Sequence, residues 1–343
     1  MNELKSFTTS FMPAIEAEMR DVLGATGGNP SPSNPFLGMI HYHMGWANED
    51  LLPAEVDRGK RIRPILCLLA CAAAGADWQL AVPAAAAVEV LHNFSLVHDD
   101  IEDVSPTRRG RPTLWTIWGQ AQAINTGDAM FALSHLAISR LLQRGVEPDV
   151  VVRALRRFDE TCVELTRGQY IDMSFEARDT VSVADYVEMI TGKTAVLVAL
   201  CAELGALIAG ADDDRVRCFS EYGLNLGLAF QVQDDILGIW GDESLTGKSA
   251  ATDIVTRKKS LPVLYALAKS QEMRSLYDGD GSDGVFVQRA TKLLNETGAH
   301  GYATEQAEKY SQQAMASLEA ARPAEPAATA LHQLTDMLLQ RRH

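Results

Sequence analysis

Two aspartate clusters, each set in an apolar stretch with helical periodicity, constrain this chain more than any other feature. The first reads DDIED at residues 99–103, and the second reads DDILG at residues 234–238. Residues four apart share one face of a helix, so Asp99 and Asp103 point the same way. Carboxylates that converge in apolar surroundings are costly to bury unless a cation joins them. Lys and Arg residues lie near both clusters in the sequence. Carboxylates with basic residues beside them suit a site where Mg²⁺ bridges protein carboxylates and a diphosphate.

The composition favours helix over sheet. Ala and Leu are abundant, while aromatic residues make up only 7% of the chain. A hydrophobic share of 47% with 22% charged residues indicates a folded protein with a substantial core. Helices are expected at 1–23, from about 36 to before Pro53, and at 64–75, 84–104, 121–144, 148–176, 183–209, 213–240, 261–269 and from 285 to the C-terminus, with a break at 322–326. Without a convincing β-hairpin signal, the sequence predicts an all-α protein.

Two turn-rich segments interrupt the helical pattern. Gly and Pro gather just before residue 35, so residues 1–35 read as an N-terminal helix and loop. Residues 276–285 are rich in Gly and Asp and predict a flexible acidic loop. Neither segment divides the pattern into separate halves. We therefore expect one helical domain over residues 1–343, with the two aspartate clusters on helices that face each other.

Charge and cysteine usage limit the class of protein. A net charge of −14 argues against a general nucleic-acid binder. Five scattered cysteines indicate reduced thiols, and Cys67 and Cys71 share one helix face, where apolar packing is favoured over a zinc site. No signal peptide and no uninterrupted apolar run of about 20 residues is found. The sequence predicts a cytoplasmic protein without a transmembrane segment.

Seven ordered motifs carry a resemblance to a known family. They are GKRIRP (59–64), HNFSLVHDD (92–100), RRGRPT (108–113), GD (127–128), GKT (192–194), FQVQDD (230–235) and KKSLP (258–262). With these motifs the chain resembles the trans-isoprenyl diphosphate synthases, and most of all the geranylgeranyl diphosphate synthases. The resemblance implies a helical bundle of the isoprenoid synthase type with a central active-site cavity. It also implies a homodimer without nucleic-acid partners.

The chemistry implied by the resemblance explains the residue types. An allylic diphosphate ionises, and isopentenyl diphosphate then attacks the resulting cation in a head-to-tail (1′-4) condensation. Departing pyrophosphate concentrates negative charge, which Mg²⁺ and fixed cations stabilise. The resemblance implies three Mg²⁺ ions per site. Their ligands would be Asp99, Asp103 and Asp234, and the wider catalytic set would include Asp100, Asp235 and Lys193.

Two diphosphate pockets follow from the same resemblance. The pocket for isopentenyl diphosphate would use Lys60, Arg63, His92 and Arg109, and that for the allylic diphosphate would use Arg108, Lys193, Thr194, Gln231, Lys248 and Lys258. Each of these residue types also has an interpretation that involves no substrate or metal. An aspartate cluster can be a solvated helix face, a lone histidine can be a core residue, and a lysine in an apolar helix can extend to the surface.

Two positions bear on catalysis and product length. Gly238 stands where the family usually has a third aspartate. The missing carboxylate should weaken the second metal shell, and water would take the place of that carboxylate. Phe94, beside Ser95, lies five residues before Asp99, where a bulky side chain would close the product tunnel in this family. Together with the short first cluster, Phe94 predicts a twenty-carbon product.

Two other functions would need only part of this pattern. A class I terpene cyclase would keep the first aspartate cluster without needing Lys60, Arg63 and His92. A catalytically silent partner subunit would be expected to lose an aspartate cluster or the basic pocket, and only Gly238 points that way. The sequence favours the Mg²⁺-dependent prenyltransferase.

Overall fold

The computed structural model describes residues 2–24, 32–54, 56, 59–175, 177–178, 180–241, 252–279 and 284–339, and these residues are almost entirely helical. The elements are α1 (Glu3–Gly24), α2 (Pro35–His43), α3 (Ile62–Ala74), η1 (Trp78–Ala81), α4 (Val82–Glu102), β1 (Thr107–Arg108), β2 (Arg111–Pro112), α5 (Leu114–Trp118), α6 (Gln120–Ser139), η2 (Arg140–Arg144), α7 (Pro148–Ser174), α8 (Val183–Ile190), η3 (Thr191–Ala195), α9 (Val196–Ile208), α10 (Asp213–Trp240), α12 (Thr252–Val255), α13 (Leu261–Lys269), α14 (Gln271–Tyr277), α15 (Gly284–Glu296), α16 (Ala299–Ala320) and α17 (Ala327–Leu339). The predicted all-α class is confirmed.

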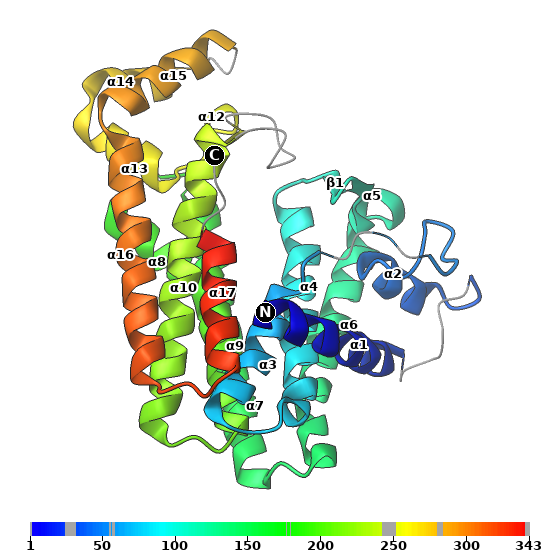
Figure 1. Ribbon diagram of the computed structural model, residues 1–343. Coiled ribbons are helices and arrows are strands. Elements are labelled where there is room, and N and C mark those ends of the chain that lie inside the picture. The colour runs from blue at the N-terminus through cyan, green and yellow to red at the C-terminus, as the bar shows by residue number, and fades with distance from the viewer. Residues whose placement is uncertain are drawn as a thin grey trace. The chain divides into compact units, whose positions relative to one another are not determined.

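The chain forms two compact units (Figure 1). Unit 1 comprises Met1–Arg157, Cys201–Asp212 and Pro323–Leu331, and unit 2 comprises Phe158–Leu200, Asp213–Arg322 and His332–His343. Helices α7, α9 and α17 each contribute residues to both units. A single domain over residues 1–343 stays a prediction, and so does the flexible acidic loop at 276–285, of which residues 280–283 lie outside the described residues.

Helix α4 forms the centre of unit 1 and carries the first aspartate cluster at its C-terminal end. Pro83 lies in the first turn of α4. Proline has no backbone N–H, but the N–H groups of a first turn have no partner within the helix, so no helical hydrogen bond is lost. The run Ala84–Ala87 is completely buried, and these small side chains allow α3 and α6 to pack closely against α4. Packing of this buried run holds α4 in place, and with it the aspartate cluster at the C-terminal end of the helix.

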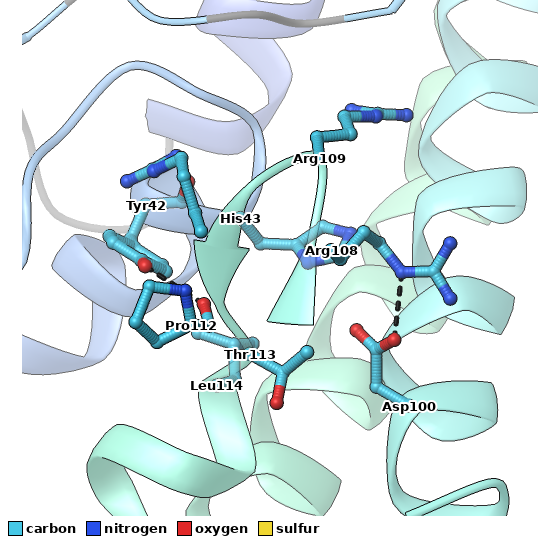
Figure 2. A pocket seen from close by; sticks show the side chains of 9 residues that line it. Tyr42, His43, Asp100, Arg108, Arg109, Pro112, Thr113 and Leu114 are labelled. Atoms are coloured by element: carbon cyan, nitrogen blue, oxygen red, sulfur yellow. Dashed lines mark hydrogen bonds and ion pairs between the residues drawn. The ribbon is translucent and has the colours of Figure 1, made fainter. Parts of the chain in front are cut away.

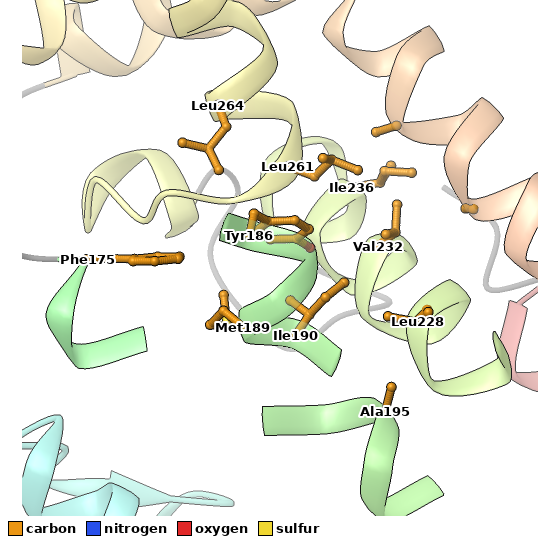
Figure 3. Packing of buried hydrophobic residues seen from close by; sticks show 12 residues of the cluster. Phe175, Tyr186, Met189, Ile190, Ala195, Leu228, Val232, Ile236, Leu261 and Leu264 are labelled. Atoms are coloured by element: carbon orange, nitrogen blue, oxygen red, sulfur yellow. The ribbon is translucent and has the colours of Figure 1, made fainter. Parts of the chain in front are cut away.

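Helix α10 holds the corresponding place in unit 2. It runs beside α16 and carries the second aspartate cluster near its C-terminal end (Figure 1). Buried side chains around Tyr186, Val232, Ile236 and Leu261 join α8, α10 and α13 into one apolar cluster (Figure 3). This packed core therefore anchors the part of α10 that carries the second aspartate cluster.

A short β-hairpin follows α4, and the sequence-based expectation of no hairpin is wrong here. Strands β1 and β2 pair Thr107 with Pro112 and Arg108 with Arg111. The two turn residues, Arg109 and Gly110, both have positive φ angles of 51° and 72°. Such two-residue turns usually contain Asn or Asp before Gly, so Arg-Gly between two-residue strands gave a weak signal.

Three helix boundaries also differ from the expected ones. Helix α2 ends at His43 rather than near residue 53. Helix α3 begins at Ile62, which places Pro64 inside its first turn. The expected helix at 183–209 is interrupted at Thr191–Ala195 by a single π-helical turn, a feature that frequently marks functional positions.

Two stretches, Trp78–Glu102 and Val183–Ile208, are long and apolar enough to cross a membrane by length and hydropathy alone. In each stretch, 72% of the most apolar 18 residues is buried inside the protein, as in a core helix.

Two of the cysteines also lie in the core. Cys67 and Cys71 are buried free thiols, and burial raises the pKa of Cys71 to about 12. Their expected role as apolar packing residues fits this burial.

Candidate active site

The first aspartate cluster divides into inward and outward carboxylates. Asp100 is 3% exposed and accepts a hydrogen bond of 2.8 Å from Nε of Arg108 (Figure 2). Burial raises the pKa of Asp100 to about 6, although Arg108 acts in the opposite direction. Asp99 is partly exposed and Asp103 is exposed. The outward pair is the one that a metal ion approaching from solvent would meet.

The hairpin returns two arginines to the end of α4. Arg108 reaches Asp100 from β1, while Arg109 extends from the tip of the turn (Figure 2). A Cβ on Gly59 would lie 3.1 Å from Nη2 of Arg109, so a side chain there would press on the guanidinium group. Glycine at residue 59, in the GKRIRP motif, thus leaves room for Arg109 beside the start of α3.

Two histidines complete a strongly basic pocket in unit 1. Burial, followed by Arg63, Arg109 and Arg108, lowers the pKa of His92 well below its usual value. His43, at the end of α2, lines a cavity of about 30 Å³ together with Arg108 and Arg109 (Figure 2). Burial and the same two arginines lower the pKa of His43 to about 3, so its imidazole is uncharged.

His43 was not among the residues selected from the sequence. Its Nε2 atom is buried and has no hydrogen-bond partner among the described residues, and the same holds for Nε of Arg63. Buried polar atoms are normally satisfied, so two unsatisfied nitrogens in this basic region indicate a missing hydrogen-bonding partner. A histidine at a helix end beside an aromatic residue was the only signal in the sequence, and it is a weak one.

A buried ion-pair network supports the basic segment before α3. Nη1 of Arg61 donates to Oε1 of Glu89 at 2.7 Å, and Nε of Arg61 donates to Oε1 of Glu16 at 3.3 Å. The Arg61 side chain is fully buried, with a left-handed backbone φ of 49°. Arg61 therefore anchors the chain between Lys60, which is exposed, and Arg63.

Phe94 packs against the neighbouring helix α6. Its ring centroid lies 5.0 Å from that of Phe131 and 4.9 Å from that of His98. A Cβ on Gly127 would lie 2.3 Å from Nε2 of His98, so only glycine fits beside this ring. The Ser95 hydroxyl donates to the His92 carbonyl at 2.9 Å and is thereby used within its own helix.

The second cluster repeats the division into inward and outward carboxylates. Asp235 is 1% exposed, and its Oδ2 accepts hydrogen bonds from the Tyr186 hydroxyl at 2.6 Å and from the Leu261 amide at 3.0 Å. Nε2 of Gln231 donates to Oδ1 at 3.1 Å, and Nζ of Lys258 lies 3.8 Å from the same oxygen. Asp234 is partly exposed.

The π-helical turn places a second set of polar groups in unit 2. A Cβ on Gly192 would lie 2.8 Å from Cα of Gly168, so α7 and this turn touch through their backbones. This approach brings Lys193 into an ion pair with Asp172 of α7. The Thr194 hydroxyl donates to Oε1 of Gln231 at 2.9 Å. Lys193 thus has the partner that a charge in an apolar helix requires.

The carboxylates fit Mg²⁺ by their chemistry. Over the described ranges, no group of three metal-binding side chains is already assembled. Mg²⁺ usually takes one or two protein carboxylates and fills its octahedron with water and substrate phosphates. Outward carboxylates on α4 and on α10 offer such incomplete donor sets. Lys248 lies outside the described residues.

Comparison with known proteins agrees with this arrangement of groups. Residues 50–294 match the family model described as polyprenyl synthetase. The chain is 42% identical over 293 residues to the geranylgeranyl diphosphate synthase of Mycobacterium tuberculosis, covering 84% of this chain and 83% of that protein. It is 43% identical over 261 residues to the (2E,6E)-farnesyl diphosphate synthase of the same species, covering 76% and 68% respectively.

A solved structure extends the likeness to the whole chain. The polyprenyl synthetase of Streptomyces coelicolor superimposes with a TM-score of 0.86 at 35% identity, covering 98% of each chain. The family match spans the GKRIRP segment, both aspartate clusters and the lysine of the π-helical turn. The same residues form the basic pocket of unit 1 and the carboxylate site of unit 2, and on these grounds the chain belongs to the polyprenyl synthetase family.

Proposed function

We propose that this prenyltransferase condenses isopentenyl diphosphate head to tail with an allylic diphosphate and releases geranylgeranyl diphosphate. The observation that supports this most is the pocket of unit 1. Arg63, Arg109, His92 and His43 gather there, and two of their buried nitrogens lack partners among the residues described. Such a pocket requires an anion with several acceptor oxygens, which a diphosphate provides.

The basic groups of the two units would have separate tasks. In unit 1, Lys60, Arg63, His92 and Arg109 would bind isopentenyl diphosphate. The allylic diphosphate would be bound by Arg108, Lys193, Thr194, Gln231, Lys248 and Lys258. Arg108 and Lys193 are held by Asp100 and Asp172, so each is already oriented before a substrate arrives.

Mg²⁺ would be held by Asp99, Asp103 and Asp234, with three ions per site. When bound, it supplies positive charge to the diphosphate that leaves. Asp100 and Asp235 would orient the site rather than touch the metal, because both are buried and hydrogen-bonded to protein groups. Lys193 and Lys258 would add fixed positive charge beside the departing oxygens.

The product length is proposed from Phe94. Its ring is braced by Phe131, so a growing prenyl tail would meet a wall that yields little. The M. tuberculosis relatives include both a geranylgeranyl and a farnesyl diphosphate synthase, so similarity alone does not choose between them. We expect Phe94→Ala to lengthen the product, and an unchanged product distribution would remove Phe94 from this role.

A homodimer and a cytoplasmic location complete the proposal. Along α7, Val152, Val163, Tyr170 and Met173 are exposed by 46% to 73%, an apolar surface that a second copy of the chain would cover. Sedimentation of the purified protein tests the dimer directly. The soluble fraction of the source cells should contain the enzyme.

The decisive test is product analysis with purified protein, Mg²⁺ and isopentenyl diphosphate. Dimethylallyl, geranyl and farnesyl diphosphate are supplied in separate reactions. A linear twenty-carbon diphosphate is expected from each primer. Cyclic hydrocarbons formed without isopentenyl diphosphate would support a terpene cyclase instead, and no turnover in any mixture would support a silent partner subunit.

A further inference from the structure

The hairpin that carries Arg108 and Arg109 has no core of its own. Its strands are two residues long, and none of residues 107–112 is buried. An isolated hairpin of this size is at best marginally stable in water. The Thr113 hydroxyl donates to the Ser105 carbonyl at 3.0 Å, which closes the base of the hairpin. Contacts with other elements must therefore fix where its two arginines lie.

Tyr42, in the last turn of α2, attaches strand β2 to the rest of unit 1. It is 3% exposed, and its hydroxyl donates to the Pro112 carbonyl at 2.9 Å (Figure 2). The guanidinium carbon of Arg111 lies 3.8 Å from the centre of the Tyr42 ring, which is a cation–π contact. The ring also meets that of Trp118 edge to face, with centroids 5.1 Å apart. Tyr42 thus joins two consecutive residues of β2 to α2.

Arg111 completes this attachment through the backbone. Its Nη1 donates to the Tyr42 carbonyl at 3.0 Å, and its Nη2 donates to the Ala47 carbonyl at 2.8 Å. A planar guanidinium can donate to two acceptors while it stacks on an aromatic ring, whereas a lysine ammonium is a point charge without that geometry. Arg111 therefore fixes β2 against the end of α2 and against the segment that follows.

The same attachment brings three basic side chains together. His43 is the residue after Tyr42 and the last residue of α2. It lines one cavity with Arg108 and Arg109 (Figure 2). Arg111 is the partner of Arg108 across the hairpin. Because Tyr42 and Arg111 join the end of α2 to β2, they determine how the histidine lies relative to the two arginines.

The other attachment of the hairpin shares its donor with a substrate. Nε of Arg108 donates to Asp100 of α4 at 2.8 Å, and the same guanidinium is proposed to bind the allylic diphosphate. A contact of this kind changes when the substrate arrives. Tyr42 and Arg111 are not among the groups proposed to touch a substrate, so their contacts can persist while the diphosphates bind.

We propose that Tyr42 and Arg111 are positioning residues for the isopentenyl diphosphate pocket. They hold β2 against α2, so that Arg109 and His43 are in place before the diphosphate binds. Groups that are already ordered lose less freedom on binding, and the affinity is correspondingly higher. This inference rests on the proposed function, because the pocket belongs to that function.

Three variants separate positioning from charge. Tyr42→Phe keeps the ring and removes only the hydrogen bond to Pro112, without any change of charge. Arg111→Lys keeps the positive charge and loses the paired hydrogen bonds, and Arg111→Met removes both. Arg20→Met is the matched control, because Arg20 makes the same kind of contact, 4.6 Å from the Trp46 ring, at an exposed residue of α1.

Affinity for isopentenyl diphosphate is measured by isothermal titration calorimetry without a primer, so that no turnover occurs. We expect Kd to rise about tenfold in Arg111→Met and about threefold in both Arg111→Lys and Tyr42→Phe. Arg20→Met should bind as tightly as the unmodified chain. Without ligand, backbone hydrogen exchange at residues 107–113 should become faster in the three variants and stay unchanged in the control.

Full recovery of binding in Arg111→Lys, together with unchanged binding in Tyr42→Phe, would show that Arg111 acts by charge alone and would overturn the inference. Unchanged hydrogen exchange in the hairpin of Arg111→Met would overturn it as well. Melting temperatures show whether each variant is folded, and Tyr42→Phe with Arg111→Lys still decides the question if Arg111→Met is not.

The two measurements also separate this inference from the proposed reaction. An unmodified chain that does not bind isopentenyl diphosphate would refute the proposed function. The exchange of the hairpin amides, which needs no substrate, would then decide by itself whether Tyr42 and Arg111 hold the hairpin. An unmodified chain that binds isopentenyl diphosphate but condenses nothing would refute the reaction and leave the positioning role to the affinities of the variants.

Discussion

The two aspartate clusters have the same internal plan and opposite surroundings. In each, the second aspartate is buried and held by protein donors, Arg108 for Asp100 and Tyr186 with the Leu261 amide for Asp235. The first aspartate of each pair is partly exposed. The hydrogen bonds of the buried aspartate thus fix the orientation of its helix, and with it the direction in which the exposed aspartate points.

The surroundings differ in charge. Asp100 lies in a basic pocket with Arg108, Arg109 and uncharged histidines, whereas Lys258 beside Asp235 is surrounded by four carboxylates. An excess of positive charge requires an anion, and an excess of negative charge requires a cation. On these grounds we propose that the first cluster binds a diphosphate as well as a metal ion, and the second chiefly a metal ion.

The largest effect should come from removing an outward aspartate from either cluster. Asp99→Ala and Asp234→Ala should each lower kcat by about a thousandfold, because charge on the leaving diphosphate would lose metal stabilisation. Steady-state kinetics at saturating substrate measure this, with Asp214→Ala, at an exposed carboxylate in the first turn of α10, as the control. Activity retained by Asp234→Ala would break the parallel between the clusters.

The second prediction separates inward from outward aspartates by stability. Asp235→Ala removes the acceptor of three donors and should lower the free energy of unfolding by about 3 kcal/mol. Asp234→Ala should cost less than about 1 kcal/mol, since its side chain is partly exposed. Urea denaturation of both variants measures the difference, and equal losses would show that the two carboxylates are not divided as described.

The sequence predicted the helices and both clusters because apolar periodicity and the i, i+4 spacing of Asp99 and Asp103 are local properties. It did not predict which aspartate of each pair turns inward. Adjacent residues on a helix differ by about 100°, so either could face the core. The choice depends on Arg108 and Tyr186, which other elements supply. The close approach of Asp253 on α12 to Gly238 on α10 was not predicted for the same reason, because it arises only on folding.

The third prediction uses the pH dependence of Asp100. Its pKa in the folded protein, about 6, lies above the ordinary value of 3.8. The protonated carboxyl therefore stabilises the fold fully below pH 3.8, and this contribution is lost as the pH rises through about 6. Relative to Asp100→Asn, the unmodified chain should lose about 3 kcal/mol between these limits.

Denaturation at pH 4 to 7.5 measures this difference between the two proteins. Asp100→Asn keeps an acceptor for Arg108, so the loss reflects charge rather than a missing hydrogen bond. A difference that does not change with pH would show that Arg108 compensates fully for the burial of Asp100. The basic surroundings of the first cluster would then be stronger than described.

The smallest effect concerns His43, which ties the basic surroundings of the first cluster to one substrate. Its buried Nε2 lacks a partner within the described part of the chain, and its imidazole is uncharged above about pH 4 because burial and the arginines lower its pKa to about 3. A diphosphate bound beside this imidazole would favour its protonated form, in which Nε2 donates one hydrogen bond to a charged acceptor, so His43→Ala should raise KM for isopentenyl diphosphate about tenfold.

The KM for the allylic primer should stay unchanged in His43→Ala, and His332→Ala, at an exposed histidine, should alter neither constant. Equal increases in both KM values would place His43 between the two diphosphates rather than in one pocket. No increase in either would mean that its unsatisfied nitrogen is tolerated in a closed core. In that case the excess positive charge around Asp100, and not the histidine, would account for anion binding by unit 1.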